Sequence, residues 1–328
     1  MKAIVYEKYG PPDVLQLQEV GKPIPKGNEV LVKVHAASVN DWDWGLLRGT
    51  PFVNRVLAGL LKPKRIKIIG GDIAGRVEAV GGNVKQFQLG DEVFGDLSGC
   101  GFGAFAEYVC ARENALVLKP ASMTFEEAAA VPQAAVLALG GLRDKGQIQP
   151  GQKVLINGAG GGAGTFAVQI AKSFEAEVTG VDSTRKLDIM RSIGADHVID
   201  YTQEDFTKNG QHYDLILDFA AHHSILDYKH ALSPKGTYVM VGGSSARMFQ
   251  TMFLGPLISM TTSKKMGMLL HRPNKDLAFI KELFEADKVK PIIDKRYPLS
   301  EVPEALRYFG KGHARGKVVI TVEHSDKI

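Results

Sequence analysis

The stretch VLINGAGGGAGT, residues 154–165, decides the fold of this chain. Its first four residues form a continuous apolar run, which is typical of a strand buried on both faces of a sheet. Residues 165–174 follow with helical periodicity. The glycines between the two allow a tight turn, a close backbone approach to a ligand and close packing of helix on strand. Because a helix N-terminus offers unpaired N–H groups and a positive dipole end, the stretch predicts a turn that binds a diphosphate.

An acidic residue, Asp182, ends the next predicted strand, Glu177–Asp182, roughly 20 residues further on, as the dinucleotide fingerprint requires. We therefore predict a dinucleotide-binding site. The choice between NAD and NADP stays open on these residues. Asp182 is suited to accept hydrogen bonds from the ribose hydroxyls of NAD and to repel a 2′-phosphate. Ser183, Arg185 and Lys186 offer a hydroxyl and two cations for that phosphate, or the two cations are solvated residues of a first helical turn.

Strands and helices alternate around this turn in the order that a doubly wound parallel sheet requires. A helical Ala- and Leu-rich stretch, 125–142, precedes it, and Gly194 stands where a helix C-cap glycine belongs. Further strands are predicted at the following positions: 197–199, 214–218 and 238–241.

The flanking regions have a different character. Short strands with glycine corners over the first ~120 residues indicate a small β-barrel, and Lys317–Val322 has the pattern of a strand that completes it. The predicted fold class is thus α/β, with a catalytic domain over 1–124 that resumes over 263–328 and a nucleotide-binding domain inserted over 125–262. We expect a ligand cleft between them.

Composition narrows the function further. The 328 residues exceed one ordinary core, and no apolar run reaches the ~18 residues of a membrane span. The first residues, MKAIVY, are strand-like and predict no signal peptide. Two cysteines, Cys100 and Cys110, exclude a disulfide framework, and a net charge of +4 does not indicate nucleic acid as a partner. A cytoplasmic protein is expected.

Five motifs occur in order along the chain: Asn40–Asp43, Gly71–Gly81, Gly90–Val93, Gly103–Tyr108 and Gly158–Gly164. Together they resemble the medium-chain dehydrogenase/reductase superfamily, in its zinc-free quinone oxidoreductase branch, over nearly the whole chain. The resemblance implies a GroES-like catalytic domain with an inserted Rossmann domain. It also implies hydride transfer from a nicotinamide cofactor, usually NADPH, to a quinone or to the activated C=C bond of an enone or enal. Members are commonly homodimers.

Zinc-dependent relatives carry a cysteine near position 40 and a His-Glu pair after paired glycines. This chain has Asn40 and Asp72 at these places, and it lacks the lobe with four structural cysteines. An amide and a lone carboxylate do not form a soft-ligand zinc site. No metal is therefore expected, and His222, His223 and His230 are interpreted as surface residues.

The resemblance also implies roles for individual residues. Asn40 matches a residue that lines the active site, and Lys186 and Tyr201 match contacts to the 2′-phosphate, which favours NADPH modestly over NADH. An arginine of some members falls on Gly312. The predicted cofactor-binding set is completed by the glycine turn, the residues that follow Glu177–Val181, and the segments beside the nicotinamide: Gly158, Gly161, Gly162, Ala163, Gly164, Asp182, Ser183, Arg185, Ala220, Val241, Gly242 and Gly243.

The sequence gives weaker evidence for the catalytic and substrate-binding residues than for the cofactor-binding residues. The family's tyrosine five residues after the asparagine is replaced by Gly45, and residues 137–139 are aliphatic, which argues against an enoyl-thioester reductase. Trp42, Trp44 and Phe52 either stack on a flat substrate or fill the core. Two alternatives to a quinone or enone reductase stay open, an enoyl-thioester reductase and a protein that binds NADPH without turnover.

One segment has a second interpretation. Lys62, Lys64, Arg65 and Lys67 follow an apolar stretch, 56–61. A solvated loop is the favoured interpretation, contact with an anionic membrane surface is the other, and stable membrane insertion is not expected.

Overall fold

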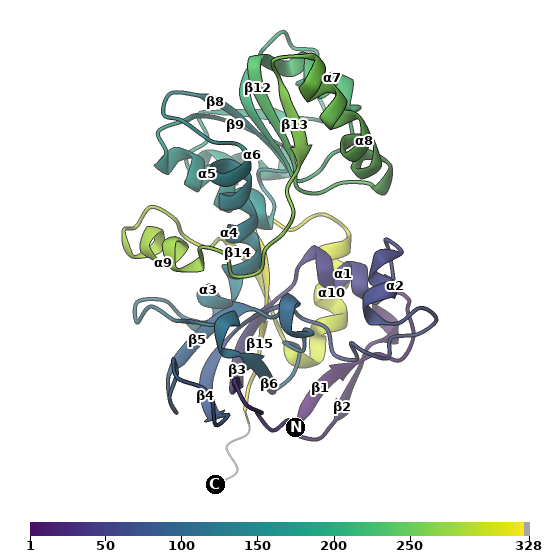
Figure 1. Ribbon diagram of the computed structural model, residues 1–328, viewed down its shortest axis with the longest axis vertical. Helices are drawn as coiled ribbons and strands as arrows, with labels where there is room; N and C mark the ends of the chain where they lie inside the picture. The colour runs from purple at the N-terminus through teal and green to yellow at the C-terminus, as the bar shows by residue number, and fades with distance from the viewer. Residues whose placement is uncertain (325–328) are drawn as a thin grey trace. The chain divides into compact units, whose positions relative to one another are not determined.

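The computed structural model describes residues 1–324, which divide into two compact units. The first contains residues 1–133, 273–285 and the C-terminal part from residue 293, and the second contains residues 134–272 and 286–292 (Figure 1). The second unit is thus inserted into the first, and the predicted α/β organisation is confirmed. No described helix is long and apolar enough to cross a membrane.

The first unit is built on a seven-stranded sheet with the order β14-β15-β3-β4-β5-β7, in which β6 also pairs with β3. Its pairings are antiparallel except for the parallel pair β14–β15. Gly75 allows two strands to approach closely here, because a Cβ on it would lie 2.2 Å from the carbonyl oxygen of Lys33. The strands are β3 (Glu29–Ser38), β4 (Asp72–Val80), β5 (Glu92–Asp96), β6 (Tyr108–Arg112), β7 (Val117–Leu118), β14 (Ile293–Pro298) and β15 (Lys317–Thr321), and a separate two-stranded sheet holds β1 (Lys2–Val5) and β2 (Gln16–Glu19).

Helices complete this unit and bury an apolar core that includes Ile4, Val32, Leu46, Phe105 and Leu306. They are α1 (Asp41–Arg48), α2 (Val53–Ala58), α3 (Phe125–Ala130), α9 (Leu277–Glu285) and α10 (Val302–Gly310).

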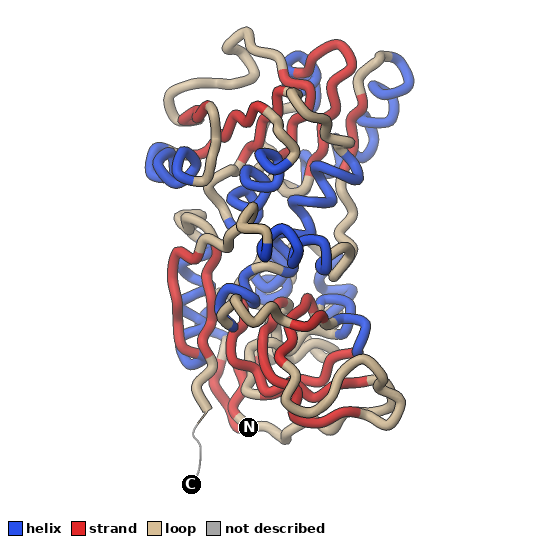
Figure 2. Tube along the Cα trace, turned by 90° about the vertical axis from the view of Figure 1, so that its left-hand side faces the viewer, coloured by secondary structure: helices blue, strands red, loops and turns tan. Residues whose placement is uncertain are grey.

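The second unit is a six-stranded, fully parallel sheet with the order β10-β9-β8-β11-β12-β13. Val154, Leu155 and Ile156 are fully buried, as the apolar run predicts for a central strand. In Figure 1, α7 and α8 lie beside β12 and β13, and the tube view of Figure 2 shows the strands of the two units as separate sheets. The elements are β8 (Lys153–Asn157), β9 (Glu177–Asp182), β10 (His197–Asp200), β11 (Tyr213–Asp218), β12 (Leu232–Met240), β13 (Lys265–Met268), α4 (Pro132–Leu139), α5 (Gly162–Ser173), α6 (Leu187–Ser192), α7 (Ile225–Ala231) and α8 (Ser245–Thr261).

The unit boundaries lie elsewhere than the predicted 124/125 and 262/263. The predicted helix 125–142 is interrupted, and its first part, α3, begins at a reciprocal cap between Thr124 and Glu127 and packs on β3, β4 and β15. At the other end, β13 adds a sixth parallel strand beyond residue 262. Both shifts arise from tertiary pairing that hydrophobic periodicity does not report. The last four residues of the predicted segment 263–328 lie outside the described range.

Candidate active site and cofactor site

The glycine turn joins β8 to α5 and depends on missing side chains. Gly158 has φ +82°, a conformation that glycine adopts without strain. A Cβ on Gly164 would lie 2.0 Å from the carbonyl oxygen of Gly158, so the helix starts against the turn itself. The turn is further tied to β9, because the N–H groups of Gly158 and Ala159 both donate to the carbonyl of Val181.

The first turn of α5 has free hydrogen-bond donors. The N–H of Thr165 donates to the carbonyl of Gly161 at 3.0 Å, whereas the N–H groups of Gly162, Ala163 and Gly164 have no acceptor within residues 1–324. Three unpaired N–H groups at the start of a twelve-residue helix, on glycine and alanine, fit a diphosphate. These residues would hold the cofactor's diphosphate by backbone hydrogen bonds.

Asp182 lies at the end of β9 and is turned toward the glycine turn. Its Oδ2 accepts the N–H of Gly160 at 3.0 Å, and its Oδ1 accepts the N–H of Ser183 at 2.8 Å. The ammonium of Lys186 lies 3.4 Å from Oδ1, and both side chains are about nine-tenths buried. The carboxylate is therefore paired with a cation and holds the glycine turn in place through the N–H of Gly160.

Other residues of the predicted phosphate contact surround this pair. Lys186 also packs over Gly160, because a Cβ added to Gly160 would lie 2.6 Å from the Cβ of Lys186. Arg185 is exposed, Ser183 is half-buried, and Tyr201 is half-exposed with its ring 6.1 Å from that of His222. Two cations, a hydroxyl and a phenol thus lie along one edge of the sheet.

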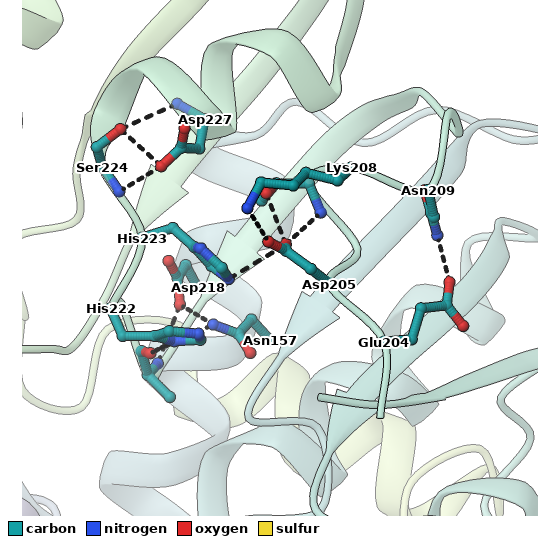
Figure 3. Close-up of polar contacts among 12 residues, drawn as sticks. Asn157, Glu204, Asp205, Lys208, Asn209, Asp218, His222, His223, Ser224 and Asp227 are labelled. Atoms are coloured by element: carbon teal, nitrogen blue, oxygen red, sulfur yellow. Dashed lines mark hydrogen bonds and ion pairs between the residues drawn. The ribbon is translucent and has the colours of Figure 1, made fainter. Parts of the chain in front are cut away.

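A buried polar network lies at the ends of β8 and β11. Asn157 donates from Nδ2 to Asp218 Oδ1 at 2.8 Å, and Tyr238 donates its hydroxyl to Asp218 Oδ2 at 3.0 Å. Figure 3 shows the Asn157 amide directed at Asp218. Burial raises the pKa of Asp218, and its hydrogen bonds oppose that rise.

Asp218 also orders the predicted nicotinamide segments. Its Oδ1 accepts the N–H of Ala220 at 3.0 Å, and its carbonyl accepts the N–H groups of Val241 and Gly242. The two segments also contact each other one residue further on, where Gly243 and Ala221 form a parallel β-bridge. Asp218 therefore positions the backbone of two loops at once.

Asn40 in the first unit is held by two charged side chains. Its Oδ1 accepts from the ammonium of Lys317 at 2.5 Å, and its Nδ2 donates to Asp72 Oδ2 at 2.9 Å. Asn40 is only 6 % exposed. Because Nδ2 carries two N–H groups, fixing one on Asp72 orients the other.

The sheet brings these three residues together. Asp72 starts β4 opposite Ser38, the last residue of β3, and β15 pairs with β3 on its other side. Lys317 Nζ lies 3.7 Å from Asp72 Oδ2, and both side chains are almost fully buried. Burial raises the pKa of Asp72 and lowers that of Lys317, and each charge opposes the effect on the other.

Two further residues complete this network. Asp43 accepts the N–H groups of Asn40 and Gly70, at 2.8 and 2.9 Å. The backbone N–H of Gln133 donates to both oxygens of Asp72, and its buried Nε2 has no partner in the described part of the chain. Sequence reasoning missed Lys317, Gln133 and Asp218, because a lysine that begins a strand and a glutamine inside a helix carry no local signal.

The predicted substrate aromatics do not gather in one place. Trp42 lies near Phe102, with ring centroids 6.1 Å apart, whereas Trp44 packs so closely on α10 that a Cβ on Gly310 would lie 2.4 Å from its ring. Phe52 is 67 % exposed. Of the three, Trp42 and Trp44 pack against the core of the first unit, and Phe52 faces outward.

The histidines of the second unit have local partners. His222 Nδ1 lies 3.0 Å from the carbonyl oxygen of Ala220, and His223 Nε2 lies 3.6 Å from Asp205 Oδ1 (Figure 3). Within residues 1–324, no three His, Cys, Asp or Glu side chains are grouped to hold a metal ion.

Comparison with known proteins identifies both units. Residues 26–121 match the alcohol dehydrogenase GroES-like domain family, and residues 193–320 match the family described as zinc-binding dehydrogenase. The chain is 35 % identical to human NAD(P)H oxidoreductase RTN4IP1, mitochondrial, over 98 % of this chain and 89 % of the relative. It is 33 % identical to 2-methylene-furan-3-one reductase of Solanum lycopersicum, over 98 % of this chain and 79 % of the relative.

A solved structure agrees over the whole length. The quinone oxidoreductase from Coxiella burnetii superposes with a TM-score of 0.86 at 30 % identity, covering 98 % of this chain and 99 % of the other. The fold is therefore the expected GroES-like domain with an inserted Rossmann domain. The chain belongs to the quinone oxidoreductase branch of the medium-chain dehydrogenase/reductase superfamily, and it is an oxidoreductase with a nicotinamide cofactor.

Proposed function

We propose that the protein transfers a hydride from NADPH, without zinc, to a quinone or to the activated C=C bond of an α,β-unsaturated carbonyl. The observation that carries the proposal is the glycine turn with three free N–H groups, beside a carboxylate that Lys186 neutralises. The names of the relatives, an NAD(P)H oxidoreductase, a furanone reductase and a quinone oxidoreductase, support the same reaction class.

A reduced nicotinamide cofactor, with its diphosphate on the N–H groups of Gly162, Ala163 and Gly164, would supply the hydride and be oxidised in doing so. For an enone, the β-carbon gains the hydride, the α-carbon gains a proton from water, and the C=C bond becomes single. Asn40 is proposed to polarise the carbonyl through the N–H of Nδ2 that Asp72 does not use. Lys317 holds Oδ1 of the same amide, which keeps that N–H in a fixed direction.

NADPH is preferred in this proposal because Asp182 has no free charge. Both of its oxygens accept backbone N–H groups, and Lys186 lies beside it. In Lys186→Ala, we expect NADPH binding to weaken by about 1–3 kcal/mol, since a hydrogen bond to a charged group is lost, and NADH binding to stay nearly unchanged.

The matched control for this variant is Lys172→Ala, which removes a cation of the same unit that pairs with Asp196 at the surface. Both nucleotides should bind this control as they bind the parent. Tighter binding of NADH than of NADPH by the parent protein would reject the preference.

The reaction class is tested by following NADPH absorbance with a quinone, a small enone and an enoyl thioester, alongside NADPH affinity measured by fluorescence. Oxidation with the quinone or the enone is the expected result. Turnover with the thioester alone would make the protein an enoyl-thioester reductase. Tight NADPH binding with no turnover on any acceptor would make it an NADPH-binding protein without catalysis.

A homodimer is the proposed assembly. The sheet of the second unit ends at β13, and the adjacent helix α8 exposes Phe249, Met252, Phe253, Leu257 and Met260. A molar mass of twice the chain mass by light scattering is expected, and a concentration-independent mass of one chain would reject it.

We propose a cytoplasmic location because Cys100 and Cys110 are both free thiols, and fractionation of cells tests it.

A further inference from the structure

The segment between Asp43 and Asp72 has a one-sided charge. Residues 44–71 contain six basic residues and no acidic one, although the whole chain carries only +4. The bases are Arg48, Arg55, Lys62, Lys64, Arg65 and Lys67. So strong a local excess of one sign predicts an electrostatic partner of the opposite sign.

Six apolar side chains of the same segment are exposed to solvent. Phe52, Val53, Val56, Leu57, Leu60 and Leu61, which we call the α2 apolar face, are between 40 and 92 % exposed. Phe52, at the N-cap, and Val53, Val56 and Leu57 lie on or at the start of α2, and Leu60 and Leu61 follow directly after its C-cap, Gly59.

The inward side of α2 is small and polar, the reverse of an ordinary surface helix. Asn54 and Ala58 are buried, and Asn54 donates from Nδ2 to the carbonyl oxygen of Thr50 at 2.9 Å. Arg55 donates from Nε to the carbonyl oxygen of Gly49. These bonds fix the helix with its apolar side chains in solvent, which is unfavourable unless something covers them.

Four of the bases follow this face directly in the sequence and make no ion pair in the described part of the chain. Lys62, Lys64, Arg65 and Lys67 are all exposed, and Arg65 donates only to the carbonyl of Val56. Throughout residues 1–324, no carboxylate lies within ion-pair distance of any of these four cations. Their charges are therefore not used within the fold.

We propose that the α2 apolar face and these four bases dock the protein on an anionic lipid surface. Leucine, valine and phenylalanine side chains would enter the boundary of headgroups and acyl chains, while the cations would meet lipid phosphates. A protein partner fits less well, because four exposed bases with no acidic residue among them match the diffuse negative charge of a lipid surface better than individually paired side chains. Docking of this kind is peripheral and needs no membrane-spanning helix. The proposal does not depend on the proposed enzymatic function.

Sedimentation of the full chain with lipid vesicles tests the proposal. We expect binding to equimolar phosphatidylcholine and phosphatidylglycerol at low salt, and little binding to phosphatidylcholine alone. Binding should weaken as salt is raised, because the Debye length falls to ~3 Å at 1 M.

Two double variants separate the contributions. Lys62→Gln with Lys64→Gln should weaken binding about fivefold for each charge removed. Leu60→Ser with Leu61→Ser should weaken it by about tenfold or more, with an unchanged unfolding midpoint, since both leucines are exposed. The matched controls are Lys235→Gln and Leu270→Ser, exposed residues of the second unit, and neither should change binding.

Three results would overturn the proposal: no binding to anionic vesicles at low salt, equal binding by the Leu60/Leu61 variant, or equal binding to neutral and anionic vesicles. The proposal would also be overturned if the parent protein self-associates, the Leu60/Leu61 variant has a smaller mass, and neither binds vesicles. That result would show a second copy of the chain as the occupant of the α2 apolar face.

Discussion

Replacing Lys317 by methionine tests the buried pair that holds Asn40. Methionine keeps the length and packing of the side chain but removes the charge, which leaves the carboxylate of Asp72 buried without its counter-charge. At 3.7 Å between Nζ and Oδ2, the attraction between the charges is about 4 kcal/mol at an effective dielectric constant of about 20. Breaking a buried pair from one side typically costs about 3–5 kcal/mol, so we expect Lys317→Met to lower the free energy of unfolding by that amount.

A double-mutant cycle shows whether the pair itself is the cause. Asp72→Asn alone leaves the ammonium of Lys317 buried and should cost a similar amount. In the double variant neither member of the pair leaves a charge buried without its partner, so it should be about 4 kcal/mol more stable than the sum of the two single losses predicts. Urea unfolding followed by circular dichroism measures all three variants at one pH.

The matched control for this cycle is an exposed pair. Lys172 and Asp196 approach more closely, at 2.7 Å, but both side chains are about one-third exposed. Lys172→Met should cost at most about 1 kcal/mol, because water screens surface pairs. The reasoning is refuted if Lys317→Met costs no more than this control, or if the two changes at Lys317 and Asp72 are simply additive.

Three other predictions concern single residues. Gly164→Ala should abolish NADPH binding and lower stability, because the new Cβ would lie 2.0 Å from the carbonyl oxygen of Gly158. The control Gly82→Ala, whose Cβ would have nothing within 4 Å, should bind NADPH normally, and a fluorescence titration measures both variants. Asn40→Ala should lower kcat for acceptor reduction about 10²-fold without changing NADPH affinity, and a parallel loss of affinity would count against its polarising role. His35, stacked on Phe125, has its pKa lowered by burial from 6.5 to about 4. The folded state therefore resists protonation of His35, and the contribution of this side chain to stability should fall by about 2 kcal/mol between pH 6.5 and 4, with partial exposure allowed for. In urea titrations at several pH values, the parent should therefore lose about 2 kcal/mol more than His35→Gln over this range, and an identical pH dependence of the two proteins would contradict the assignment.

Local patterns predicted most of the inserted unit. The predicted strand Glu177–Asp182 is confirmed residue for residue, and Gly194 has φ +101° immediately after Ile193, the residue that caps α6, where a terminating glycine belongs. These features depend on neighbours in the sequence, where glycine, β-branched residues and apolar runs carry a direct physical signal. The ends of the elements and the strand β13 were harder to predict from the sequence, because they depend on pairing between distant strands.

The polar networks show where sequence reasoning stops. Asn40 was predicted from the resemblance, but its partner Lys317 is 277 positions away, and only the pairing of β15 with β3 brings them together. Asp182 was predicted as a cofactor contact, and its hydrogen bond from the N–H of Gly160 was not predicted. A side chain's direction depends on the donors around it, and composition and spacing do not specify those donors.

Calorimetric titration of the protein with NADPH is the most direct test of the claim that the amides after Ile156 hold a dinucleotide. We expect saturable binding of one nucleotide per chain, weaker binding of NADH, and loss of both signals in the folded Gly164→Ala variant. No heat with either nucleotide from the folded parent protein, or undiminished binding by a folded Gly164→Ala variant, would contradict it.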